Sequence, residues 1–228
     1  MHLAIVDDVV REAEPKLKGT CKCCGSQVIA KCGRHVAWHW AHGSLAECDP
    51  WWETETVWHR DWKNHFPFDC QEVIQHDPAT NEKHIADVKT AHGIVVEFQN
   101  SPIKPEELQS RETFYKPMVW VVNGRRNEAD AFYFHQGLDQ NKLQLVSEKN
   151  GYKFSWFSRG KLPHNWASAL HPVFFDFGQD AILQLLSFDL KTKNGLVKPI
   201  LKTDFISAIL NGTLPQADRL APGVILRA

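Results

Sequence analysis

The sequence contains no apolar run approaching the ~20 residues that a membrane-spanning helix needs. Its first ten residues, MHLAIVDDVV, carry no basic segment, and their apolar run is too short for a secretory signal peptide. We therefore expect a cytoplasmic protein that does not bind membranes. The net charge is only −1, so a polyanionic partner has to be held by a local basic surface and not by overall charge.

The sequence has no cysteine after Cys70. All six cysteines lie in the first third of the 228 residues. In a chain without a secretory signal, such clustering favours metal ligation over a disulfide framework. The CKCCG of residues 21–25 contains a Cys-x-x-Cys-Gly turn, which brings two thiolates to one Zn²⁺. The HWAH of residues 39–42 supplies two imidazoles, which we expect on one helical turn or tight loop.

These residues predict a closed, tetrahedral, structural zinc site, and its expected ligands are Cys21, Cys24, His39 and His42. Alternatives are Cys23 in place of Cys24, and Cys32 or Cys48 in place of a histidine. A further alternative is a set of buried thiols and core histidines without metal. Because residues 1–50 are too few to hold a core by themselves, zinc would supply part of their folding energy.

Residues 82–101, EKHIADVKTAHGIVVEFQNS, contain two β-branched runs joined by a short connection that ends in glycine. A three-residue loop over 91–93 fits a β-hairpin whose last loop residue has positive φ. Counting outward from that loop places Asp87 opposite Glu97, with Gln99 on the same face as Glu97. Facing carboxylates are costly to bury unless a cation lies between them. The hairpin thus indicates a metal site, with a half-exposed pair of solvated acids as the alternative.

Residues 51–66 fit a helix that ends before Pro67, with tryptophans recurring at helical spacing as a core stripe. Glu55, His59 and Lys63 follow at i, i+4 and i+8, so they share one edge of that helix. We interpret these three as a row facing the same cleft as the hairpin acids. The alternative is a solvated Glu–Lys ladder, which is common on exposed helices.

Residues 71–76 predict a strand, residues 105–115 a helix with proline in its first turn, and residues 118–123 a buried strand. The remaining predictions are a connection with a short strand over 127–144, amphipathic helices over 179–190 and 203–210, and an irregular tail over 214–228. Aromatic residues interleaved with lysines over 151–203 indicate an ordinary core under a lysine-rich surface. A stacking surface for unpaired bases is the alternative.

Together these motifs resemble those of the competence-protein CoiA-like nuclease family, within the restriction-endonuclease-like (PD-(D/E)XK) superfamily. The resemblance covers residues 19–124, and its motifs are CxxCG at 21–25, HWAH at 39–42, E-x3-H-x3-K at 55–63, ADV at 86–88, EFQNS at 97–101 and R-x3-Y at 111–115. It implies an α/β fold with a restriction-endonuclease-like core of helix, three strands, helix and strand. We expect a zinc-binding element over 1–50, this nuclease core over 51–135 and a C-terminal α+β extension over 136–228.

The resemblance also implies a Mg²⁺- or Mn²⁺-dependent DNA nuclease in which Asp87 and Glu97 hold the metal. Gln99 stands where the wider superfamily carries a lysine, so Lys89 or Lys63 is expected to supply the missing cation. The remaining expected site residues are Glu55 and His59 on the predicted helix row, and Arg111, Tyr115 and Lys89 as contacts to DNA phosphates.

Two alternatives belong to other functional classes. A catalytically silent nucleic-acid-binding module of the same fold is favoured by the neutral side chain of Gln99. A zinc-organised protein-interaction domain leaves the acidic hairpin unexplained. No sequence feature indicates the DNA form or an oligomeric state.

Overall fold

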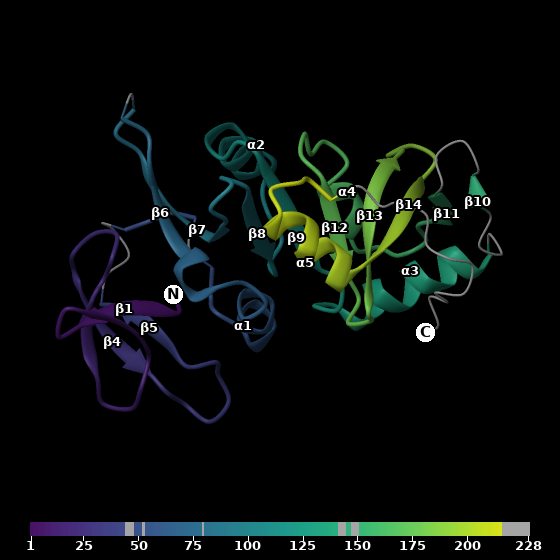
Figure 1. The fold of residues 1–228 in the computed structure, drawn as a ribbon. Helices are drawn as coiled ribbons and strands as arrows, with labels where there is room; N and C mark the ends of the chain where they lie inside the picture. The colour runs from purple at the N-terminus through teal and green to yellow at the C-terminus, as the bar shows by residue number, and fades with distance from the viewer. Residues whose placement is uncertain (44–47, 52, 79, 141–144, 147–150, 216–228) are drawn as a thin grey trace. The chain divides into compact units, whose positions relative to one another are not determined.

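The computed structural model describes residues 1–43, 48–51, 53–78, 80–140, 145–146 and 151–215 (Figure 1). The chain divides into two compact units, residues 1–89 and residues 90–228. We describe each unit by itself. The three-part division at residues 50 and 135 stays a prediction.

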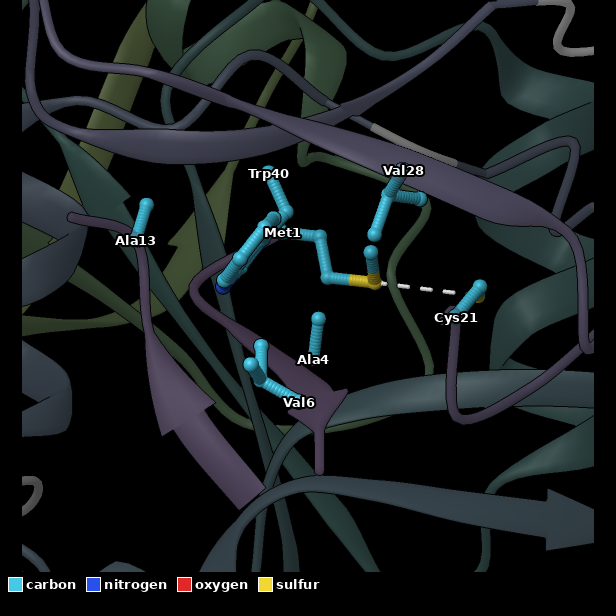
Figure 2. Packing of buried hydrophobic residues seen from close by; sticks show 7 residues of the cluster. All are labelled: Met1, Ala4, Val6, Ala13, Cys21, Val28 and Trp40. Carbon is cyan, nitrogen blue, oxygen red and sulfur yellow. Dashed lines mark hydrogen bonds between the residues drawn. The ribbon is translucent and has the colours of Figure 1, made fainter. Parts of the chain in front are cut away.

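Unit 1 begins with a small antiparallel sheet of strand order β2-β1-β3-β4-β5. Its strands are β1 Leu3–Val6, β2 Val9–Glu12, β3 Lys18–Thr20, β4 Gln27–Lys31 and β5 His39–His42. Asp7 and Asp8 both have positive φ, 50° and 62°, so a two-residue turn of the type that matches strand twist joins β1 to β2. Figure 2 shows the core of this sheet, where Trp40 is fully buried and the Met1 sulfur lies 3.8 Å from Cys21 Sγ.

The rest of unit 1 contains the helix α1 Val57–Lys63, the 3-10 turn η1 Phe68–Cys70, and the antiparallel strands β6 Gln71–His76 and β7 Lys83–Lys89. The helix predicted over residues 51–66 is therefore too long. Thr56 caps α1, because its Oγ1 accepts a hydrogen bond from His59 N at 3.3 Å while its own N–H donates to His59 Nδ1. Glu55 consequently lies in the segment before the helix.

Unit 2 contains a mixed sheet of strand order β10-β11-β14-β13-β12-β9-β8. Its strands are β8 Val95–Gln99, β9 Met118–Asn123, β10 Leu145–Val146, β11 Gly151–Ser155, β12 Val173–Asp176, β13 Ala181–Phe188 and β14 Asn194–Leu201. The strands β8, β9 and β12 run parallel, whereas the pairs from β12 to β10 are antiparallel. The chain is thus α/β, as predicted, and its large sheet is mixed.

The helices of unit 2 are α2 Pro105–Phe114, α3 Glu128–Gln140, α4 Leu162–Asn165 and α5 Lys202–Leu210. Phe205 of α5 packs on Phe174, with ring centroids 4.9 Å apart, whereas Phe134 of α3 packs on Phe175 at 6.0 Å. Because neighbouring residues of a strand point to opposite faces, α3 and α5 cover opposite faces of this sheet. Figure 1 shows α5, in yellow, lying against the strands of unit 2.

Several spans predicted from the sequence are confirmed: β6, α2, β9 and α5 fall at residues 71–76, 105–114, 118–123 and 202–210. Phe154, Trp156 and Phe174 are buried, so the aromatic residues of this region form a core, as predicted. Residues 216–228 of the predicted tail lie outside the described residues.

Two predicted elements are wrong. Residues 179–190 contain the strand β13 and no helix, because β12 and β14 both pair with it and that tertiary environment overrides helical periodicity. Residues 128–140 of the predicted connection form the helix α3, where a short strand was expected. Asn127 begins it, since its Oδ1 accepts a hydrogen bond from Ala129 N at 3.0 Å.

Among the described residues, no helix is long and apolar enough to cross a membrane.

Candidate zinc centre and candidate active site

Cys21, Cys24, His42 and Cys48 form a cluster whose ligand atoms all lie within 4.8 Å of one another. The Cys21 and Cys48 sulfurs are 3.8 Å apart, and Cys24 Sγ lies 3.4 Å from His42 Nε2. Zn–S bonds of about 2.3 Å place two sulfurs of a tetrahedral site about 3.8 Å apart. The Cys3His cluster is therefore compatible with a zinc ion.

The turn between β3 and β4 places the first two cysteines. Gly25 has φ of 74°, a conformation that glycine adopts without steric cost, and its N–H donates to Cys21 O at 3.0 Å. The amide of Cys23 points at Cys21 Sγ, 3.4 Å away. This is the amide-to-sulfur arrangement that supports metal-bound thiolates.

The four ligands differ in how readily they ionise. Burial raises the pKa of Cys21 and of Cys48; the neighbouring Cys24 also raises that of Cys21, and Cys21 also raises that of Cys48. Burial also opposes ionisation of Cys24, but hydrogen bonds with Ser26 and His42 lower its pKa to about 6. Because a ligating cysteine must be a thiolate, a bound cation would overcome the cost of ionising Cys21 and Cys48.

The cluster contains Cys48 where the sequence analysis expected His39. The HWAH residues form strand β5, and side chains alternate along a strand, so positions i and i+3 point to opposite faces. The two histidines consequently diverge: His42 reaches Cys24, whereas His39 Nδ1 lies 2.8 Å from Ala37 O. The expectation of one helical turn or tight loop was wrong, and it accounts for the difference in ligands.

A second cluster surrounds Lys63, whose side chain is only 1% exposed. Its ammonium nitrogen lies 2.8 Å from Glu55 Oε2, 3.1 Å from Glu72 Oε1 and 3.6 Å from Asp87 Oδ1. We call these four residues the Lys63 group. Asp87 is 24% exposed, whereas the Glu55 and Glu72 side chains are at most 5% exposed. Asp87 is therefore the carboxylate that this group presents to solvent.

Glu72 is the member of this group that the sequence analysis missed. The register of β6 and β7 pairs Gln71 with Val88 and Val73 with Ala86, which puts Glu72 opposite Asp87. Its carboxylate also accepts hydrogen bonds from the backbone amides of His2 and Leu3. The only available signal was an acidic residue inside a predicted strand.

The backbone of Glu72 is strained, with φ of 47°. A non-glycine residue in this region costs about 1–3 kcal/mol and persists only where its surroundings hold it firmly. The contacts to Lys63 and to two backbone amides supply that restraint.

The charges of the Lys63 group stabilise one another. Burial would raise the pKa of Glu72, but the charge on Lys63, the N-terminal ammonium and the amides of His2 and Leu3 lower it to about 2. Burial would lower the pKa of Lys63, yet Glu72, Glu55 and Asp87 together raise it above its ordinary value. Lys63 and Glu72 are consequently charged at neutral pH.

His59, the middle residue of the predicted row, has different contacts from Glu55 and Lys63. Its Nε2 lies 3.0 Å from Glu53 Oε2, and its Nδ1 lies 2.8 Å from Thr56 Oγ1. The structure thus brings Glu55, Lys63 and Asp87 together, whereas His59 forms the capping box at the start of α1.

The loop after β7 has the predicted hairpin geometry. Thr90 N–H donates to Ile94 O at 3.0 Å, as a three-residue loop requires, and Gly93 has φ of 84°. In the following strand, Glu97 is buried and its Oε2 lies 3.0 Å from Arg111 Nη1. Gln99 Nε2 donates to Ser101 O at 3.0 Å.

The three residues predicted to contact phosphate have protein partners or are buried. Arg111 pairs with Glu107 as well as with Glu97, and its side chain is 7% exposed. Tyr115 is buried at the end of α2. Lys89 Nζ donates to Gln75 Oε1. Their contacts to DNA stay predictions.

The fold and these clusters define an α/β protein with a mixed sheet and a Cys3His cluster suited to zinc in its first unit. Residues 10–50, which contain all four cluster residues, match the family model of the competence protein CoiA N-terminal domain. The resemblance to the CoiA-like family is thereby confirmed over this part of the chain. Comparisons with curated proteins and with solved structures gave no significant match.

Proposed function

We propose that this protein is a divalent-metal-dependent nuclease that acts on DNA, and that zinc stabilises its N-terminal unit. The match of residues 10–50 to the competence-protein family supports this proposal. The order α1, β6, β7, β8, α2, β9 supports it as well, because a restriction-endonuclease-like core has helix, three strands, helix and strand in that order.

The observation that carries the proposal is the buried Lys63 group. Removing charged groups from water costs several kcal/mol each, and well-packed apolar residues often stabilise a fold equally well. A buried cluster of this kind is therefore a functional candidate. Three carboxylates against the ammonium groups of Lys63 and of the N-terminus leave net negative charge, and Asp87 is the most exposed of the three. Carboxylate oxygens are the protein ligands that Mg²⁺ prefers, so the donor atoms fit the proposed ion.

Each residue has a distinct proposed role. Asp87 and Glu97 hold the divalent cation, and Lys63, which is too buried to touch a substrate, positions Asp87. A carboxylate has about four acceptor positions, so the Arg111 ion pair leaves Glu97 able to ligate a metal. Gln99 orients a water molecule or a phosphate oxygen. A bound Mg²⁺ or Mn²⁺ would neutralise phosphate charge and lower the pKa of the attacking water.

The test is cleavage of duplex, single-stranded and branched DNA by the parent protein, with and without Mg²⁺ or Mn²⁺. We expect metal-dependent cleavage that Asp87→Asn and Glu97→Gln each abolish. Gln99→Ala should lose less activity, because a neutral amide supplies no charge. Gln99→Lys, which restores the charge of the wider superfamily, should remain active.

Asp69→Asn is the matched control, since it removes an exposed acid of the same unit outside the Lys63 group. Thermal melting of Glu97→Gln checks folding, because this substitution removes a charged partner of buried Arg111. DNA binding should persist in Asp87→Asn, since the lost carboxylate repels phosphate. Cleavage that survives in the double variant Asp87→Asn, Glu97→Gln would contradict the assignment of the active site.

The second candidate is a catalytically silent DNA-binding module of the same fold. It is favoured by the ammonium group of Lys63, which lies among the carboxylates where a metal would be expected, and by the Arg111–Glu97 ion pair. Binding of DNA by the parent protein without cleavage under any divalent metal would select this candidate.

A further inference from the structure

A cavity of about 540 Å³ lies in unit 2, at the edge of the sheet where the parallel strands β8 and β9 end. The segments that follow these strands, residues 100–105 and 124–127, line it. Carboxyl ends of neighbouring parallel strands meet at one edge, and open α/β sheets bind ligands there. The proposed nuclease roles use none of the cavity residues.

Three cationic side chains line this cavity, and each comes from a different segment. Lys104 precedes α2, Arg126 precedes α3 and Lys161 precedes α4. None of the three forms an ion pair with another described residue. Asp130 is the acidic lining residue, and its Oδ1 accepts a hydrogen bond from Ser158 Oγ at 3.1 Å. Positive charge therefore predominates, which favours an anionic ligand.

Hydrogen bonds hold two amide side chains of the same lining in place. Asn123 Nδ2 donates to Asn100 Oδ1 at 2.9 Å, and Asn123 Oδ1 accepts from Arg125 N at 2.9 Å. Side-chain amides carry both donors and acceptors, so they suit the polar edge of a base or a sugar hydroxyl. Their positions at the strand ends are fixed before any ligand binds.

The rest of the lining supplies an apolar surface. Ile103 is 6% exposed and Trp166 is 4% exposed, and the Trp166 ring packs on Trp120 with centroids 5.1 Å apart. Leu162, which follows the cationic Lys161 in sequence, also lines the cavity. An apolar, aromatic surface beside clustered cations is the combination that binds a base together with its phosphate.

We propose that this cavity binds a nucleotide. Its phosphate contacts Lys104, Arg126 and Lys161, and its base lies against Ile103 and Trp166. A free nucleotide and the terminal nucleotide of a DNA strand share this chemistry. The inference goes beyond the proposed nuclease activity, because binding here requires neither a divalent metal nor cleavage.

The test is calorimetric titration of the full-length, zinc-containing protein in buffer without added Mg²⁺ or Mn²⁺. The probes are deoxyadenosine, its 5′-monophosphate, and one single-stranded oligonucleotide with and without a 5′-phosphate. Charge-assisted hydrogen bonds to phosphate are strong, so each unphosphorylated probe should bind at least about tenfold more weakly than its phosphorylated counterpart. Binding of the monophosphate identifies a free-nucleotide site, whereas binding of the phosphorylated oligonucleotide alone identifies a strand-end site.

The double variant Arg126→Ala, Lys161→Ala should weaken binding of the phosphorylated probe at least about tenfold. Both side chains are exposed, so the variant is expected to fold. Lys153→Ala, on strand β11 and outside the cavity lining, is the matched control and should bind like the parent.

Asp87→Asn should also bind like the parent, which separates this inference from the proposed active site. The inference is overturned if phosphorylated and unphosphorylated probes bind equally, if neither binds, or if the double variant binds as tightly as the parent.

Discussion

Two backbone conformations place the ligand atoms of the candidate zinc centre. The turn at residues 21–25 folds back on itself through Gly25, so Cys21 and Cys24 approach one point. The extended conformation of β5 then selects His42 and turns His39 away. A side chain from Cys48, beyond the strand, completes the set.

The ligand set can be tested by replacing the residues that distinguish the two assignments. We expect Cys48→Ser to lose zinc and to lower the free energy of unfolding, because a closed zinc site contributes folding energy. His39→Ala should retain about one zinc per chain. Elemental analysis of protein purified without added metal measures the zinc content. Cys32→Ser is the control, and zinc loss in His39→Ala but not in Cys48→Ser would contradict the Cys3His assignment.

Lys63 allows a second prediction at the scale of single residues. Lys63→Gln leaves three carboxylates without their common partner, and breaking a buried ion pair in this way costs about 3–5 kcal/mol. Urea unfolding of both proteins in buffer without added Mg²⁺ or Mn²⁺ measures the change in the free energy of unfolding. Lys83→Gln, an exposed residue of β7, should change it by less than about 0.5 kcal/mol. Equal stability of Lys63→Gln and the parent would remove the energetic argument for this group.

At the scale of elements, the start of α1 decides which residues can meet Lys63. The capping box between Thr56 and His59 begins the helix at Val57, so Glu55 lies outside it. Glu55 thus lies in the segment before the helix, from which its carboxylate reaches Lys63 at the other end of α1.

Removing that cap should weaken the helix. We expect Thr56→Ala to lower the free energy of unfolding by about 1 kcal/mol, because the N–H of His59 loses its acceptor. Thr56→Ser keeps the hydroxyl and should cost much less. Chemical denaturation of both variants provides the measurement, and equal losses in the two would show that the hydroxyl does not carry the effect.

The elements of the C-terminal region show how pairing decides secondary structure. The run AILQLLSF has apolar residues at spacings that suit either a helix or a buried strand. Pairing with β12 on one side and β14 on the other stabilises the strand conformation of this run. In α3, the close approach of Gly137 to β11 leaves no room for a side chain, since a Cβ would lie 2.0 Å from Ser155 O.

At the scale of the whole molecule, the charges of the Lys63 group couple folding to pH. The pKa of Glu72 is about 2 in the folded protein, against 4.5 for an ordinary glutamate. A lowered pKa contributes stability that is fully present above pH ~4.5 and is lost as the pH falls toward ~2. The parent protein should therefore lose stability across this range.

Glu72→Gln removes this contribution, so its free energy of unfolding should start lower at pH 7 and decline less steeply between pH ~4.5 and ~2. Denaturation curves of both proteins at several pH values measure the two slopes. Zinc release at low pH affects both proteins, so the difference between them isolates Glu72. Equal slopes of the free energy of unfolding against pH in the two proteins would show that the pKa of Glu72 does not change on folding.

The sequence by itself determined the features that depend on neighbouring residues. The Cys-x-x-Cys-Gly turn, the loop closed by Gly93 and the spans of β6, α2 and β9 follow from local backbone preferences and short-range periodicity. Part of the zinc centre was predictable for the same reason.

Only the tertiary structure decided which distant side chains complete each cluster. Cys48 joins the cysteines of a turn more than twenty residues earlier, and Glu72 joins Lys63 through the register of β6 with β7. The strand conformation of β13 depends on its partners β12 and β14. These outcomes depend on contacts between segments far apart in the sequence, and the periodicity of one segment carries no information about which other segment packs against it.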